Sequence, residues 1–172
     1  MLKKIPNILT IGRIIIVPIF VTTFFLPGFY GDVIPCFLFV LASFTDFLDG
    51  LLARLFKEES KLGELLDPIA DKIIVATALI LLVMDGTIKN LEVVAAIIIL
   101  IREILISGLR EFLAKGQINL TVSNLAKLKT VLQMFSISIL LSGETDNKIL
   151  NFQDYNSQSI GIIMLWLSAY IT

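Results

Sequence analysis

The sequence predicts an all-α membrane domain with six transmembrane helices. Of the 172 residues, 56% are hydrophobic and only 17% are charged, whereas about 25% are charged in a typical soluble domain. The mean hydropathy is +0.90. The apolar residues form continuous runs, and about 20 helical residues cross a hydrocarbon core of about 30 Å. Because these runs do not alternate between apolar and polar residues, helices are favoured over the strands of a membrane barrel.

Six apolar spans follow one another, each ended by a short polar break. The first comes after Lys3 and Lys4 and has no small-residue cleavage site before Pro27, so we interpret it as a retained helix, not a signal peptide. The breaks are expected at residues 27–32, 56–62, 85–90, 115–120 and 143–156. The expected spans are Ile8–Leu26, Val33–Leu55, Gly63–Met84, Leu91–Leu113, Val122–Leu141 and the residues from Ser157 onward. We expect them to form a single domain over residues 1–172.

The distribution of lysine and arginine predicts the orientation of the spans. Positively charged segments stay on the cytoplasmic side of a membrane. Lys89 and Lys148 lie toward one side, and the other twelve of the fourteen cations lie at or toward the opposite side. Those twelve are Lys3, Lys4, Arg13, Arg54, Lys57, Lys61, Lys72, Arg102, Arg110, Lys115, Lys127 and Lys129. Both termini are therefore expected to be cytoplasmic.

The composition also excludes several kinds of chemistry. The sequence contains no histidine, so neither histidine acid/base catalysis nor a histidine-ligated metal site is available. The single cysteine, Cys36, excludes both a disulfide framework and a cysteine metal cluster. A formal net charge of −1 gives no basic excess of the kind that nucleic-acid binding requires. Catalysis would have to use carboxylates, amines, hydroxyls or bound ions.

Four aspartates stand out within the second and third spans. Asp46 and Asp49 are three residues apart, and Asp67 and Asp71 are four residues apart, so each pair shares one helical face. With a turn near residues 56–62, Asp49 lies about seven residues before the turn and Asp67 about seven after its likely midpoint, a rise of roughly 10 Å along each helix. The two pairs are therefore expected at similar depth.

Four clustered carboxylates need a cation in a membrane. On a lenient insertion scale they would cost about 10 kcal/mol together if unpaired. Arg54 and Lys72 are nearby in sequence but cannot balance four negative charges. Clustered carboxylate oxygens are the ligands that Mg²⁺, Mn²⁺ or Ca²⁺ prefers. A divalent metal site is the economical interpretation.

Small residues lie beside the acidic positions. Gly50 and Ala53 continue the stripe that Asp46 and Asp49 begin, at i+4 and i+7. They could let a ligand approach the backbone. The alternative is that they only permit close helix packing in lipid.

The acidic segments carry a longer motif. DFLDGLLAR, from Asp46 to Arg54, is followed after eight residues by GELLDPIAD, from Gly63 to Asp71. This pattern resembles the signature of the CDP-alcohol phosphatidyltransferase family, Asp-x-x-Asp-Gly-x-x-Ala-Arg and then Gly-x-x-x-Asp-x-x-x-Asp. All eight specified positions match, namely Asp46, Asp49, Gly50, Ala53, Arg54, Gly63, Asp67 and Asp71.

The resemblance implies a fold and a set of roles. The fold would be six helices around a polar cavity that faces the cytoplasm, usually in a homodimer. Asp46, Asp49 and Asp67 would hold two ions, Mg²⁺ or Mn²⁺, on the diphosphate of the CDP-lipid. Asp71 would bind metal or accept the proton of the acceptor hydroxyl, with Asp67 beside it as the second candidate catalytic carboxylate; a purely metal-binding role for Asp71 is the alternative. The nucleotide site would be lined by Gly50, Ala53, Arg54 and Gly63.

Other segments resemble the bacterial members of the family that use sn-glycerol 3-phosphate as the acceptor. These are KIPNILTIGRIIIVPIF near the start, IREILISGLREFLA from Ile101 to Ala114, and LAKLKTVLQM from Leu125 to Met134. One departure is Ala126, where that subgroup usually has glycine. The implied reaction converts CDP-diacylglycerol and glycerol 3-phosphate to phosphatidylglycerophosphate and CMP in the bacterial inner membrane, with the active site facing the cytoplasm.

A phosphorylated acceptor would need a basic pocket. The candidates for its phosphate are Arg110, Lys127 and Lys129, since arginine makes two-pronged phosphate contacts and lysine adds a compact charge. These residues could instead be positive-inside anchors, or Arg102 and Arg110 could pair with Glu103 and Glu111. On the first span, a polar face could touch the cytidine or the cavity rim, or could cap and anchor that helix. It consists of Asn7, Thr10 and Arg13.

Three other functions are compatible with parts of the sequence. A family member could use inositol phosphate, serine or phosphatidylglycerol as the acceptor. Carboxylates within a membrane also mark the ion pathways of cation transporters, although transport gives no reason for the spacing of the signature. A non-catalytic membrane scaffold would tolerate the loss of Asp67 and Asp71.

Overall fold

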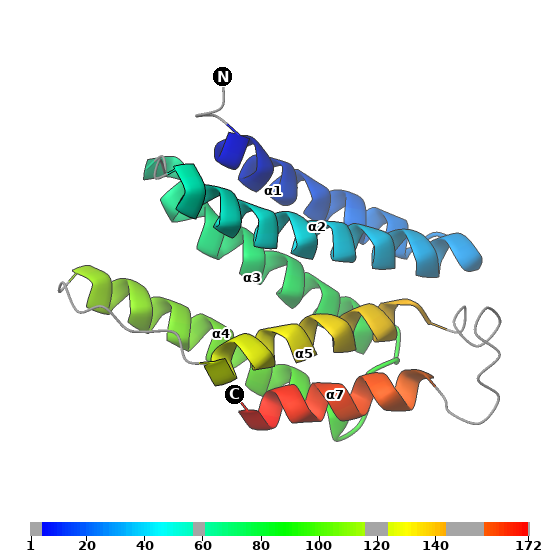
Figure 1. The fold of residues 1–172 in the computed structure, drawn as a ribbon. Coiled ribbons are helices and arrows are strands. Elements are labelled where there is room, and N and C mark those ends of the chain that lie inside the picture. The colour runs from blue at the N-terminus through cyan, green and yellow to red at the C-terminus, as the bar shows by residue number, and fades with distance from the viewer. Residues whose placement is uncertain (1–4, 57–60, 116–123, 144–156, 172) are drawn as a thin grey trace. The chain divides into compact units, whose positions relative to one another are not determined.

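The computed structural model describes residues 5–56, 61–115, 124–143 and 157–171. Within these ranges it contains six helices and no strands, each helix within a few residues of a predicted span. The helices are α1 (Ile5–Phe24), α2 (Phe29–Phe56), α3 (Lys61–Met84), α4 (Glu92–Lys115), α5 (Asn124–Leu141) and α7 (Ser157–Ile171). Two compact units divide the chain, unit 1 (Met1–Leu81) and unit 2 (Leu82–Thr172), and each is described by itself. The all-helical prediction is confirmed for the described residues (Figure 1).

The number of membrane spans is not settled by length and hydropathy. In the described part of the chain, the segment Phe29–Asp46 is long and apolar enough to cross a membrane. Ile11–Phe24 and Ser157–Ile171 are apolar but shorter. Six spans therefore stay a prediction.

In unit 1, α1 and α2 pack together as a helical hairpin (Figure 1). After α1 ends, the backbone turns at Gly28, whose φ of 66° is in the left-handed region that glycine adopts without strain. The expected break at residues 27–32 is wrong for its last four residues, because α2 already begins at Phe29. Asp32 lies in the first turn of α2, where a negative charge interacts favourably with the helix dipole.

Close packing at the hairpin involves backbone as well as side chains. Phe20 and Phe39 are fully buried, with ring centroids 6.4 Å apart. Near the turn, a Cβ atom added to Gly31 would lie 2.0 Å from the carbonyl oxygen of Leu26. Only glycine therefore fits at this position of α2.

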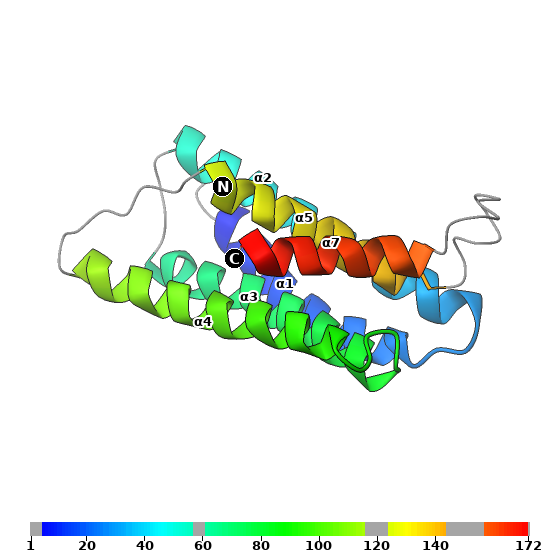
Figure 2. The ribbon, with the colours of Figure 1, turned by 90° about the horizontal axis from the view of Figure 1, so that it is seen from below.

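Unit 2 is built on the contact between α5 and α7, which lie side by side in Figures 1 and 2. The Ser136 hydroxyl donates a 2.7 Å hydrogen bond to the carbonyl oxygen of Gly161 across this contact. A Cβ on Gly161 would lie 2.8 Å from side-chain atoms of Leu140, so the absence of a side chain lets the helices approach. Helix α4 also packs against α7.

The connection from α3 to α4 is tied to α7. The Asp85 carboxylate accepts hydrogen bonds from the backbone N–H of Thr87 at 2.9 Å and from its hydroxyl at 3.0 Å. The side-chain amide of Gln158 donates to the carbonyl oxygen of Thr87 at 2.9 Å. These bonds hold the loop against the first turn of α7.

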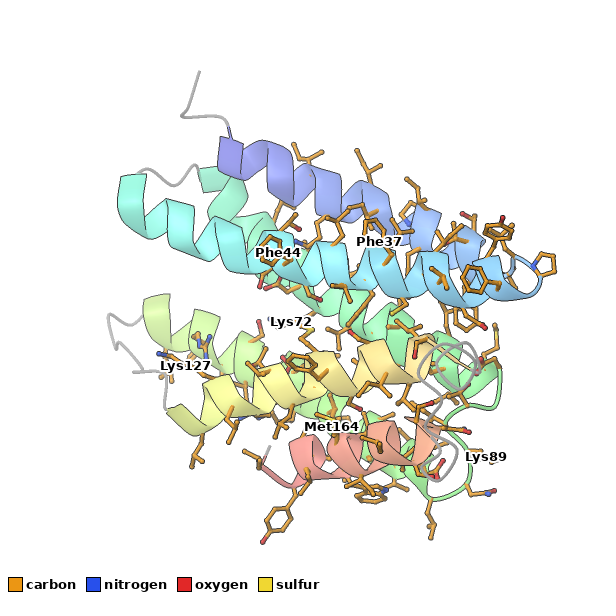
Figure 3. The ribbon with its side chains drawn as sticks, turned by 45° about the vertical axis from the view of Figure 1, so that its right-hand side comes forward. Phe37, Phe44, Lys72, Lys89, Lys127 and Met164 are labelled. Atoms are coloured by element: carbon orange, nitrogen blue, oxygen red, sulfur yellow. The ribbon has the colours of Figure 1, made fainter. Side chains whose placement is uncertain are left out.

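Large apolar side chains lie on the outer surface of the helices. On α2, Phe37 and Phe44 are 63% and 56% exposed, and Figure 3 shows both side chains on this helix. Extended exposed apolar surface is unusual for a soluble monomer and marks contact with lipid or protein. The surface of α2 agrees with its composition as a membrane-crossing segment.

Candidate functional site

One arginine joins three helices of unit 1. Nη1 of Arg13, on α1, lies 3.0 Å from Oδ1 of Asp46 on α2 and 2.5 Å from Oδ1 of Asp71 on α3. The two carboxylate oxygens are therefore no more than about 5.5 Å apart, the sum of these distances. The first and last aspartates of the signature thus meet at a single guanidinium nitrogen.

Burial differs sharply between the cation and the anions. The Arg13 side chain is 1% exposed, whereas those of Asp46 and Asp71 are 41% and 35% exposed. A guanidinium keeps its charge in proteins, and a buried charge is costly without a partner of opposite sign. The two carboxylates supply that partner and still keep part of their surface accessible.

The role of Arg13 differs from the one that its sequence position indicated. We expected it on a polar face at the cavity rim or as an anchor, and its side chain is instead buried against the acidic site. The sequence did contain a signal for this buried ion pair, because Arg13 is the one charged residue in the sequence of α1. A charge inside an apolar span usually faces a partner of opposite sign in the bundle.

Several predicted site residues lie outside the part of the chain whose side chains are described. They are Asn7, Thr10, Asp49, Gly50, Ala53, Arg54, Gly63 and Asp67. Among the described side chains, no three acidic, cysteine or histidine residues form a metal-binding group. The predicted roles of these eight residues stay predictions.

Unit 2 contains a second ion pair, whose cation is buried and whose anion is partly exposed. Lys129, on α5, donates from its ammonium group to the carboxylate of Glu103 on α4. The lysine side chain is 1% exposed and the glutamate side chain 26% exposed. One turn along α5, the side chain of Gln133 is also buried. Glu103 was weighed in the sequence only as a partner of its neighbour Arg102.

The other two candidates for acceptor phosphate lie on the surface of unit 2. Arg110 on α4 and Lys127 on α5 are both exposed. Figure 3 shows Lys127 near the start of α5 and Lys89 on the loop between α3 and α4, at opposite ends of unit 2. The predicted division of positive charge between two membrane sides stays a prediction.

Comparison with known proteins identifies the family. The family model described as CDP-alcohol phosphatidyltransferase matches residues 3–172. The chain belongs to the CDP-alcohol phosphatidyltransferase family. Membership makes it a transferase, as the signature from Asp46 to Asp71 predicted.

Curated relatives carry one name over most of the chain. A Rickettsia typhi protein named CDP-diacylglycerol–glycerol-3-phosphate 3-phosphatidyltransferase is 41% identical over 171 residues, which is 99% of this chain and 92% of that protein. A Cereibacter sphaeroides protein of the same name is 44% identical over 141 residues, covering 81% of this chain and 64% of that protein. A Yersinia pestis protein of that name is 36% identical and covers 98% of this chain and 88% of its own length.

The family is generally dependent on a divalent metal, and the described site fits such an ion. Asp46 and Asp71 present carboxylate oxygens, the hard donors that Mg²⁺ and Mn²⁺ take. Their side chains come from two different helices and are partly exposed, so an ion can reach them. The identity and number of the ions stay predictions.

Proposed function

We propose that this protein transfers the phosphatidyl group of CDP-diacylglycerol to sn-glycerol 3-phosphate, giving phosphatidylglycerophosphate and CMP. The names of relatives that match 99% of the chain support both the donor and the acceptor. Glycerol 3-phosphate and a CDP-lipid are therefore the proposed substrates. One family model over residues 3–172 also supports the prediction of a single functional domain.

The observation that carries the proposal is the meeting of Asp46 and Asp71 at Arg13. It draws the two ends of the signature, which lie on different helices, to one place in unit 1. Figure 1 shows α2 and α3 running in opposite directions. Asp49 is one turn beyond Asp46 on α2, and Asp67 is one turn before Asp71 on α3. Because α2 and α3 run in opposite directions, both steps lead toward the end of α2 and the start of α3.

In this proposal Asp46, Asp49 and Asp67, with or without Asp71, would hold two divalent cations, Mg²⁺ or Mn²⁺. When bound, the cations offset the charge on the donor diphosphate and on the departing CMP. Asp46, Asp49 and Asp67 act as ligands, and Asp71 is either a further ligand or the proton acceptor. The nucleotide is assigned to Gly50, Ala53, Arg54 and Gly63, with Asn7 and Thr10 as additional contacts on α1.

The reaction needs one proton transfer and one exchange of bonds at phosphorus. The acceptor hydroxyl oxygen forms a bond to the phosphorus that carries diacylglycerol, and the bond from that phosphorus to the CMP oxygen breaks. The hydroxyl proton goes to Asp71, or to Asp67 if Asp71 acts only as a ligand. No histidine is required, in agreement with its absence from the sequence.

The acceptor phosphate is assigned to Arg110, Lys127 and Lys129. Arg110 and Lys127 are exposed and can reach a ligand from the aqueous phase. Lys129 is buried and paired with Glu103, so a phosphate bound there would share the ammonium group with that carboxylate. Among the three, Lys129 therefore has the most constrained position.

We further propose that the protein lies in the bacterial inner membrane as a homodimer with six spans and with both termini and the active site on the cytoplasmic side. Exposed apolar side chains such as Phe37 and Phe44 support contact with lipid. The placement of Lys127 and Lys89 at opposite ends of unit 2 supports the orientation.

The test is CMP release from CDP-diacylglycerol by purified protein with Mg²⁺ and sn-glycerol 3-phosphate, followed by identification of the lipid formed. Wild type and Lys89→Gln, which removes an exposed cation far from the signature in sequence, should form phosphatidylglycerophosphate. Asp71→Asn and Asp67→Asn should lose at least 100-fold in rate, because a general base or ligand contributes about 10²–10⁴-fold.

Other outcomes are equally informative. A lipid product formed only with serine, inositol phosphate or phosphatidylglycerol would overturn the acceptor and keep the reaction class. If no alcohol supports CMP release by folded protein, and Mn²⁺ crosses vesicles that contain the protein, catalysis is wrong and cation transport replaces it.

A further inference from the structure

Arg13 occupies the buried side of the acidic site. Its Nη1 contacts Oδ1 of both Asp46 and Asp71, and its side chain is 1% exposed. A guanidinium is not deprotonated in proteins, so the buried Arg13 side chain keeps its positive charge. The site thus contains a permanent positive charge next to the oxygens that are proposed to bind metal.

Two kinds of cation can neutralise these carboxylates. Arginine does so through N–H groups, and Mg²⁺ or Mn²⁺ does so by direct coordination, at about 2.0–2.1 Å for Mg²⁺. An ion coordinated by the oxygens that Arg13 contacts would lie within a few ångströms of the guanidinium. Two like charges at that separation repel, and the repulsion is strong where water is scarce.

We propose that Arg13 is a positioning residue and resident counter-ion: it holds Asp46 and Asp71 together when metal is absent, and its charge weakens the binding of divalent metal at the same carboxylates. The inference rests on the metal site of the proposed function. It assigns to α1 a role in metal affinity, although the signature lies entirely on α2 and α3.

The proposal separates two effects of removing the charge. Without a cation, Asp46 and Asp71 repel each other, so the metal-free protein becomes less stable. The metal then becomes the principal counter-ion and binds more tightly, because it no longer meets the positive charge of Arg13. Arg13→Gln should therefore lower the metal-free melting temperature and also tighten metal binding.

The experiment measures Mn²⁺ binding by electron paramagnetic resonance and melting temperature with and without Mn²⁺, in detergent and in the absence of substrate. Arg13→Gln should lower the Mn²⁺ dissociation constant at least tenfold and enlarge the Mn²⁺-induced rise in melting temperature. Arg13→Lys keeps the charge and should stay within threefold of wild type in affinity. Lys89→Gln controls for net charge and should match wild type.

Unchanged or weaker Mn²⁺ binding in Arg13→Gln would overturn the inference. Equally tight Mn²⁺ binding in Arg13→Lys and Arg13→Gln would also overturn it, because the effect would then come from the shape of the side chain and not from its charge. If Arg13→Gln does not fold without metal, the inference requires that Mn²⁺ restores its folding. A variant that stays unfolded in Mn²⁺ would overturn the inference. If wild type shows no Mn²⁺ binding that Asp46→Asn removes, the proposed metal site itself fails, which is a different result.

Discussion

Replacing Glu103 by glutamine tests the buried ion pair of unit 2. The change leaves the Lys129 ammonium, on a side chain that is 1% exposed, without its carboxylate. Breaking a buried pair from one side costs about 3–5 kcal/mol, because the remaining charge loses this counter-ion and stays out of water. Lys129→Met leaves Glu103 instead, and this side chain is 26% exposed and can turn toward solvent. The expected cost of Lys129→Met is therefore smaller, about 1–3 kcal/mol.

The double variant distinguishes an ion pair from two unrelated side chains. Glu103→Gln with Lys129→Met removes both charges, and its unfolding free energy should be within about 2 kcal/mol of wild type. Denaturant unfolding in mild detergent measures each value through the fluorescence of Trp166, the single tryptophan, which lies on α7 in unit 2.

A matched control lies on the same helix. Lys127→Gln removes an exposed charge two residues from Lys129 and should change the unfolding free energy by no more than about 0.5 kcal/mol. The buried-pair reasoning would be refuted if the double variant lost as much unfolding free energy as the two single variants together. It would also be refuted if Glu103→Gln lost less than about 1 kcal/mol.

Three further predictions concern the helix contacts and the metal. Gly31→Ala should lower the free energy of unfolding by about 3 kcal/mol or more, because its Cβ would lie 2.0 Å from the backbone oxygen of Leu26. Gly12→Ala is the control: its Cβ would meet nothing within 4 Å, so the variant should be as stable as wild type or more stable when both are melted thermally. Gly161→Ala should lower the free energy of unfolding by about 1–2 kcal/mol, because its Cβ would press on the Leu140 side chain, which can only partly move aside. Equal melting temperatures for wild type and variant would contradict the close α5–α7 contact. EDTA should abolish CMP release and added Mg²⁺ should restore it, and activity that persists in chelator would exclude the proposed metal chemistry.

The positions of the helices could be predicted from the sequence because long apolar runs and polar breaks are local signals. The error at the start of α2 has a local cause as well. Asp32 was placed in the polar break at residues 27–32, but an acidic residue in the first turn stabilises a helix. The four residues from Phe25 to Gly28 separate α1 from α2.

The partners of buried charges were harder to predict. The spacing of Asp46 and Asp71 indicated a shared site, and their convergence at Arg13 agrees with it. The contact between Arg13 and Asp71 joins residues 58 positions apart, and the contact between Lys129 and Glu103 joins residues 26 positions apart. Helical periodicity shows which face a residue occupies, but it does not show which other helix packs there.

The link between Arg13 and Asp46 has a consequence for how the chain enters a bilayer. On the translocon scale, a single arginine or aspartate at the centre of a span costs about 2.5–3.5 kcal/mol. Both residues belong to one helical hairpin. In the proposed topology, α1 and α2 inserted together would deliver the two charges as a neutral pair. Synthesis of α3 then brings Asp71 to an arginine that is already in place. In that topology, α1 should stay at the translocon until α2 has emerged.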